Sequence, residues 1–354
     1  GNYTLTNLPL TDLATIRQRP LSTWQSTSGG LWSDSRNWDV LPLGTNNVAA
    51  VFIPSGSGPV LYESGAGTVA IQSLEVGGDL VINGSGLSFE ALRISGGKLS
   101  GSDSLVVNGG FAQSGGLISG FKSVNLSQPS GGLSIVDASI SVTGPDGIRI
   151  ASSSGDVDID GGIFSAPGAQ IQLTAGTVSS ANLSLRGGLK LDARSDVANG
   201  GKLTLAGQDI TLDGVVLRTS GVDNGGSILV QANRDLLINA SRIVADPPSS
   251  TGGSVSLSGE SVVVSGGSSG TVLNVFGATS GLLTIGSTST RSIKIDSGTR
   301  SELGPAGKRL FITADGGIVD DQGVVVTLPL PGTTNVSEQP QNLIPDPVSY
   351  THLT

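Results

Sequence analysis

The feature that most constrains the fold of this chain is a repeat of about 26 residues near its middle. The segment Asn199–Leu205 (NGGKLTL) returns as Asn224–Val230 (NGGSILV), and again as Gly252–Leu257 (GGSVSL). A sandwich of two sheets gives no reason for the same short strand to recur at a fixed interval, whereas a stack of coils does. The repeat therefore predicts a solenoid.

Each repeat also contains a second and a third short strand. The second strand carries two apolar positions that recur once per repeat: Ile210, Leu236 and Val262 form one set, and Leu212, Ile238 and Val264 form the other. In the third strand, Leu217 aligns with Ile243. Three strands in about 25–27 residues are what one coil of a right-handed parallel β-helix requires. We expect each apolar set to form a ladder inside the coils, with Cα atoms ~5 Å apart.

Short alternating patterns extend this prediction to residues 68–327. Triplets such as Leu105-Val106-Val107 place two apolar side chains on one face of a strand. They are too short for amphipathic helices. Glycine accounts for 54 of the 354 residues, and 37% of the chain is hydrophobic, so turns and strands dominate and the chain is not disordered by composition. The fold class predicted is all-β.

Residues 20–67 differ from the rest because they contain all three tryptophans of the chain. A solenoid needs a cap, since its end coil otherwise exposes apolar side chains and an unpaired strand edge. Trp32, Asn37 and Trp38 are the candidate cap residues. The alternative is a platform on which sugar rings stack. We favour the cap because large aromatic side chains mostly serve burial.

The C-terminal residues 328–354 are rich in proline and have little apolar periodicity, which predicts a linker or tail. The ending Pro347–Thr354 resembles a translated sequencing adapter. This leaves open that residues 347–354 are not native.

Three passages carry a resemblance to a known family. The segments Gly1–Thr6 and Leu13–Ile16 look like the closing strands of a YDG-type glycine-rich repeat, and Pro20–Trp24, Gly30–Ser33 and Asn37–Pro42 are similar to the module that follows such repeats. The Gly-Gly-x-Leu-x-Leu coils resemble haemagglutinin-type shafts. Together these passages resemble filamentous-haemagglutinin-like large exoproteins, which are adhesins of Gram-negative bacteria.

This resemblance implies that residues 1–19 are the trailing strands of a preceding β repeat. It implies a secreted or cell-surface protein, exported by an outer-membrane transporter, with an adhesive or structural role. The expected partners are host-cell, matrix or polysaccharide surfaces, together with end-to-end self-association.

The charge and hydropathy of the chain exclude other partners. The formal net charge is −9, whereas nucleic-acid binding depends largely on Lys and Arg that neutralise phosphates. No apolar run approaches the ~20 residues that span a bilayer. We therefore expect no nucleic acid and no membrane insertion. Arginines that occur singly are interpreted as solubilising charges; these are Arg149, Arg186, Arg194, Arg218, Arg234 and Arg242.

Asp156, Asp158 and Asp160 are the best candidates for a ligand site. They alternate with Val157 and Ile159, so if those two point inward the three carboxylates share an outer face at steps of roughly 7 Å. Such a row could bind Ca²⁺ or sugar hydroxyls. The alternative, which we favour, is a solvated strand face that resists aggregation.

Nothing else in the sequence indicates catalysis. A second candidate cluster is formed by Asp315, Asp320 and Asp321, but the adjacent Asp320 and Asp321 fit a turn. The one histidine, His352, lies in the tail. We therefore expect no catalytic residue, no cofactor and no metal, and a protein that is not an enzyme. The alternative function is a carbohydrate-binding or polysaccharide-degrading β-helix. Its mark would be long loops with acidic and aromatic residues on one side of the helix.

Overall fold

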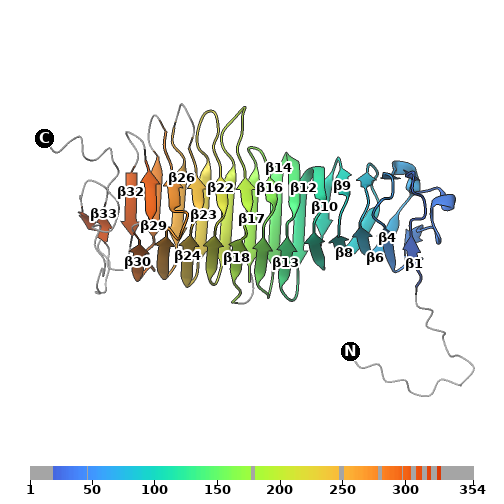
Figure 1. Cartoon of the computed structure of the whole chain (residues 1–354), viewed down its shortest axis with the longest axis horizontal. Helices are drawn as coiled ribbons and strands as arrows, with labels where there is room; N and C mark the ends of the chain where they lie inside the picture. Colours follow the sequence, from blue (N-terminus) through green and yellow to red (C-terminus); the bar gives the residue numbers. More distant parts are fainter. Residues whose placement is uncertain are drawn as a thin grey trace, which may run out of the picture.

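The computed structural model describes residues 19–45, 47–176, 180–246, 251–277, 281–296, 298–303, 308–312, 317–319 and 325–327. These residues form an elongated stack of coils (Figure 1), in which each strand pairs in parallel with the equivalent strand of the next coil. The predicted all-β class and parallel β-helix are confirmed. The strands fall into three stacks, which we number 1 to 3.

Stack 1 contains the strand that comes between the other two in each repeat. Its members are β1 (Leu21–Thr23), β4 (Ala50–Ile53), β6 (Val69–Val76), β8 (Leu87–Ile94), β11 (Phe111–Ser114), β13 (Leu133–Val136), β15 (Val157–Asp160), β18 (Leu183–Arg186), β21 (Ile210–Asp213), β24 (Asp235–Asn239), β27 (Ser261–Ser265) and β30 (Ser292–Ile295). The short β3 (Gly44–Thr45) pairs with the start of β6.

Stack 2 contains the strand that follows stack 1 along the chain. Its members are β2 (Gly30–Leu31), β5 (Val60–Tyr62), β7 (Leu80–Ile82), β9 (Lys98–Gly101), the first parts of β12 (Leu117–Gln128) and β14 (Ser139–Ser152), β16 (Ile163–Ser165), β19 (Lys190–Asp192), β22 (Val216–Arg218), β25 (Arg242–Val244), β28 (Thr271–Asn274) and β31 (Thr299–Glu302). Two short 3₁₀ helices, Ser35–Asn37 and Ser64–Ala66, lie near its N-terminal end.

Stack 3 completes each coil from β10 onward. Its members are β10 (Ser104–Val107), the second parts of β12 and β14, β17 (Gln170–Ala175), β20 (Lys202–Gly207), β23 (Ser227–Ala232), β26 (Ser254–Ser258), β29 (Leu282–Gly286) and β32 (Lys308–Ile312). Stacks 2 and 3 form one continuous sheet because β12 and β14 run through the corner between them. β33 (Gly317–Val319) and β34 (Val325–Thr327) then add in antiparallel fashion.

The core consists of the ladders that the repeat predicts. Ile210 pairs in register with Leu236, and Leu236 pairs with Val262. The set two residues along, Leu212, Ile238 and Val264, pairs in the same way. All six side chains are at most 1% exposed. The apolar residue therefore meets its own equivalent above and below, which is how a coil too small to fold alone is stabilised.

The length of the coil varies along the rod. The predicted period holds from Val157 to Val262, but the pairing of Leu74 with Leu92 closes a shorter coil, and that of Val262 with Ile293 closes a longer one. The short coil has no stack 3 strand between β7 and β8, and the long coil has extra residues in segments 266–270 and 287–291. The connection from stack 2 to stack 3 also varies in length. In an early coil β9 is followed almost directly by β10, whereas the whole segment 219–226 separates β22 from β23. Figure 1 shows long connections above the yellow and orange coils.

Both ends of the rod differ from the predicted domain boundaries. β1 pairs with β4 and β2 with β5, so the parallel coils begin in residues 20–67 and not at residue 68. Toward the other end, parallel pairing stops at β32 because the next two strands reverse direction. The aspartates at 315, 320 and 321, His352, and the segments 1–18 and 328–354 lie outside the described residues.

In the part of the chain that the structure describes, no helix has the length and hydrophobicity that crossing a membrane requires.

Candidate functional site

The tryptophans pack together at the N-terminal end of the rod. Trp24, Trp32 and Trp38 are 1%, 0% and 6% exposed. The ring centroids of Trp32 and Trp38 lie 4.7 Å apart, those of Trp24 and Trp38 lie 4.9 Å apart, and Tyr62 meets Trp32 at 5.4 Å. All three contacts are edge-to-face, the arrangement that the ring quadrupoles favour.

The polar atoms of this aromatic cluster are bonded internally. The indole Nε1 of Trp32 donates to the carbonyl of Pro42 at 3.1 Å, and that of Trp38 donates to the carbonyl of Trp32 at 2.7 Å. Asn37 holds the loop by donating from Nδ2 to the carbonyl of Leu31 at 3.2 Å. A sugar platform needs an exposed ring face, and these rings are covered. Their geometry fits closure of the end coils.

Asp156, Asp158 and Asp160 lie at β15, in stack 1, with Val157 and Ile159 buried between them. The structure brings the two later carboxylates together around Arg186 in β18, on the next coil. The Arg186 guanidinium lies 2.8 Å from Asp158 and 3.0 Å from Asp160.

The first carboxylate of the row has a different role. Asp156 accepts from the backbone N–H of Asn182, which is also on the next coil, at 2.7 Å. The hydrogen bonds from Arg186 to Asp160 and to Asp158 raise the pKa of the arginine above its usual value, so it stays charged. Among the described residues, no group of three or more Asp, Glu, His or Cys side chains could hold a metal ion. The row ties coil to coil, and its ligand-binding role stays a prediction.

Replacing Arg186 with alanine should lower the free energy of unfolding by about 1 kcal/mol or less. The change removes two inter-coil ion pairs, but the side chains of Asp158, Asp160 and Arg186 are 39%, 43% and 45% exposed, so water screens them. Urea unfolding followed by circular dichroism measures the effect. Arg149→Ala is the matched control, because Arg149 lies exposed on stack 3 and forms no ion pair within the described ranges. A loss of several kcal/mol would show that the bridge dominates coil stacking.

Side-chain bonds between neighbouring coils, like those of Arg186, recur along the rod. Polar side chains bond across neighbouring coils in several further pairs: Lys122 with Asp103, Arg234 with Asp209, Asn239 with Asp213, and Ser220 with Asp246. Asn274, which is 4% exposed, donates to both Asp246 and Glu302. These acidic side chains therefore bond to neighbouring coils and help to hold the coils in register.

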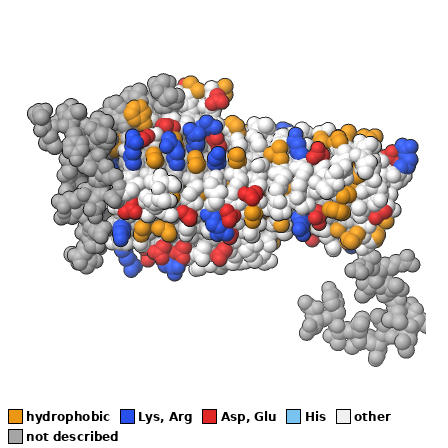
Figure 2. All heavy atoms as spheres, viewed as in Figure 1, with side chains coloured by type: hydrophobic (Ala, Val, Ile, Leu, Met, Phe, Trp, Pro, Cys, Tyr) orange, Lys and Arg blue, Asp and Glu red, His pale blue; other side chains and the backbone are white. Residues whose placement is uncertain are grey.

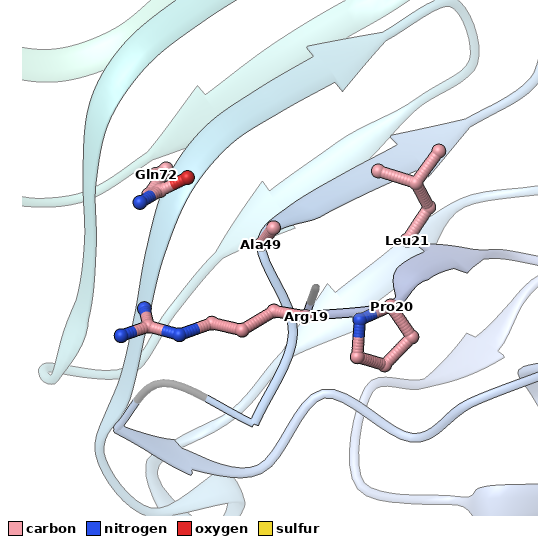
Figure 3. Close-up of a pocket in the computed structure, with 5 residues that line it drawn as sticks. All are labelled: Arg19, Pro20, Leu21, Ala49 and Gln72. Carbon is pink, nitrogen blue, oxygen red and sulfur yellow. The ribbon is translucent and has the colours of Figure 1, made fainter. Parts of the chain in front are cut away.

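Two surface hollows could in principle hold a small molecule. The first, of about 620 Å³, is lined by Arg19, Pro20, Leu21, Ala49 and Gln72 (Figure 3). The Arg19 side chain extends toward the strand that carries Gln72. Among the lining residues that the structure describes, Arg19 is the one ionisable group, so these residues do not pair an acid with a base as hydrolysis requires.

The second hollow, of about 460 Å³, lies where stack 3 begins. Its described lining includes Gln170, Asn199 and Asn224, several glycines, and Lys202 as the one ionisable residue of that set. A polar hollow of this kind offers hydrogen bonds but no acid–base pair.

Comparison with protein families, with curated proteins and with solved structures finds no match for this chain. The resemblance to filamentous-haemagglutinin-like exoproteins therefore rests on the residue patterns alone, and function has to be argued from geometry.

Stacking of the coils creates one arrangement of side chains that was not predicted from the sequence. Arg242 was interpreted as an isolated charge, but stacking places it in one outer row of stack 2 with two other basic residues, Lys190 and Arg300. In register, that row runs Ile163, Lys190, Val216, Arg242, Val272 and Arg300. The signal was available, because the alignment of Leu217 with Ile243 also aligns Val216 with Arg242. Apolar and basic side chains alternate along this row, which we call the stack 2 row.

Proposed function

We propose that this chain is a structural and adhesive rod of a secreted or cell-surface protein, and that it is not an enzyme. The observation that carries the proposal is that acidic side chains of the rod bond to partners on neighbouring coils. Carboxylates that would serve catalysis are engaged with partners on the next coil, as Asp158 and Asp160 are with Arg186. Such a chain presents long, regular outer faces and a continuous core, which suit spacing and attachment.

Attachment needs a surface that repeats along the rod, and three stacks of short strands supply it. Each outer position recurs at every coil, ~4.8 Å from its neighbour. A partner that contacts one coil weakly can contact the next in the same way, so weak contacts add along the rod.

Secretion and a Gram-negative surface enter the proposal through the family resemblance. The proposed partners are host-cell, matrix or polysaccharide surfaces, with export by an outer-membrane transporter. The alternative, a carbohydrate-degrading β-helix, has less support, because no group of three or more acidic or histidine side chains that could hold a metal ion gathers within the described ranges.

The proposal is tested by coating beads with the purified chain and counting beads retained by epithelial cells, by matrix proteins and by polysaccharide films. We expect retention well above that of beads coated with the same protein after thermal unfolding. Retention equal to that control on all three surfaces would contradict the proposal. So would release of reducing ends or unsaturated uronates from polysaccharide, lost on mutating Asp156, Asp158 or Asp160.

A further inference from the structure

In the stack 2 row, basic side chains alternate with apolar side chains from one coil to the next. Its basic residues Lys190, Arg242 and Arg300 are exposed and occupy every second coil. Between them lie Val216 and Val272, which are half-buried. Figure 2 shows blue and orange side chains alternating along one level of the rod, on the half nearer the C-terminus.

Two of these cations have no ion pair in the described part of the chain, namely Lys190 and Arg242. The third, Arg300, lies 3.1 Å from Glu302 on its own strand. On the coil between the first two, Arg218 is half-buried in the adjacent row, and its Nε atom is buried without a hydrogen-bond partner among the described atoms.

Two acids on the same strands as these cations are already engaged. Asp192, two residues from Lys190, is ion-paired with Arg194 at 2.7 Å, and Glu302 accepts from Asn274 as well as facing Arg300. The row is therefore a locally cationic strip on a protein whose net charge is −9. Local positive charge that no protein group neutralises favours an anionic partner.

The spacing of the cations narrows the class of anion. Equivalent atoms on alternate coils are separated by two inter-strand distances, ~9.6 Å. Each strand of a nucleic-acid duplex carries a charge roughly every 3.4 Å, so most of its phosphates would find no partner here. An extended disaccharide has a length similar to the spacing of two coils. A valine between two cations presents an apolar surface against which the C–H face of a neutral sugar packs.

We propose that the stack 2 row binds an anionic polysaccharide with one carboxylate per disaccharide. Lys190 and Arg242 pair with the carboxylates of successive repeats, and Val216 contacts the neutral sugar between them. The proposal deepens the adhesive function proposed above, on which it rests, by naming the class of ligand and the face that binds it. The contacts are charge-assisted hydrogen bonds, which weaken as salt screens them.

The test uses the full chain and hyaluronan oligosaccharides, in which glucuronate alternates with a neutral sugar. Binding is measured by calorimetry and by retardation in native gels that contain the polymer. We expect Lys190→Glu/Arg242→Glu to weaken binding about tenfold or more, because two exposed ion pairs become repulsive. The control, Arg149→Glu/Lys294→Glu, makes the same change of charge at exposed positions on stacks 3 and 1 and should alter affinity less than about twofold. Both variants change outward-facing side chains, and circular dichroism checks their fold.

The outcomes separate this inference from the proposed function. Equal loss in the two double variants, or tighter binding of heparin or single-stranded DNA than of hyaluronan, would overturn the ligand class, because charge alone would then explain binding. Absence of hyaluronan binding while coated beads still attach to surfaces would overturn the ligand and leave the adhesive rod standing. Hyaluronan binding by the wild type, without retention of beads on any surface, would instead refute the adhesive function.

Discussion

Replacing Leu236 with aspartate is expected to lower the free energy of unfolding by about 4 kcal/mol or more. Leu236 is 1% exposed and lies in stack 1 between Ile210 on the preceding coil and Val262 on the next. A carboxylate there loses its hydration and meets apolar side chains above and below. Guanidinium unfolding monitored by circular dichroism measures the loss.

The neighbouring residue provides the control. Leu237 belongs to the same strand but is 41% exposed on the outer face, so Leu237→Asp should change the free energy of unfolding by less than about 1 kcal/mol. Because each coil is stabilised by its neighbours, limited proteolysis of the Leu236 variant should cut first near β24. Equal midpoints for the two variants would mean that residue 236 does not face the core ladder.

Truncating Trp32 to alanine should destabilise the N-terminal coils by about 3–5 kcal/mol. The side chain is fully buried, contacts the rings of Trp38 and Tyr62, and donates to the carbonyl of Pro42. Its removal leaves a cavity at the end of the stack, where neighbours on one side alone can compensate. Hydrogen exchange of the amides in β2 and β5 measures the resulting fraying.

Leu31→Ala is the matched control for this prediction. Leu31 precedes Trp32 in the chain but is 47% exposed, so its truncation should leave those exchange rates nearly unchanged. If the amides of β2 and β5 exchange at the same rates in the Trp32→Ala and Leu31→Ala variants, the aromatic cluster does not close the end of the rod. A role for its rings outside the fold would then have to be considered.

The inner ladders could be predicted from the sequence because burial imposes one kind of side chain on every coil. Ile210, Leu236 and Val262 differ in shape but share hydrophobicity, so their regular interval remains visible. The short early coils could not be predicted in this way. Leu74 and Leu92 stack in the same inner ladder, but fewer residues separate them than in the later coils. A search for one fixed period does not detect this pair.

The outer rows escaped prediction for a related reason. Solvent tolerates almost any side chain, so Lys190 and Arg242 look like isolated charges until the register places them two coils apart. The partners of the aspartates were equally hidden. Arg186 follows Asp160 by one full coil, and only the paired strands show that these residues are neighbours.

The unequal coil lengths have a consequence for how such a chain tolerates change. The added residues leave the pairing intact. Stack 3 keeps its register from Leu203 through Ile228 to Val255, and stacks 1 and 2 pair continuously over the same coils. The corner between stacks 2 and 3 thus behaves as an insertion point, where the entropy of a longer loop rises only slowly with its length. Sequence there can drift, lengthen or accept a foreign peptide without disturbing the core. A rod of this design separates the residues that the fold constrains from those that it leaves free.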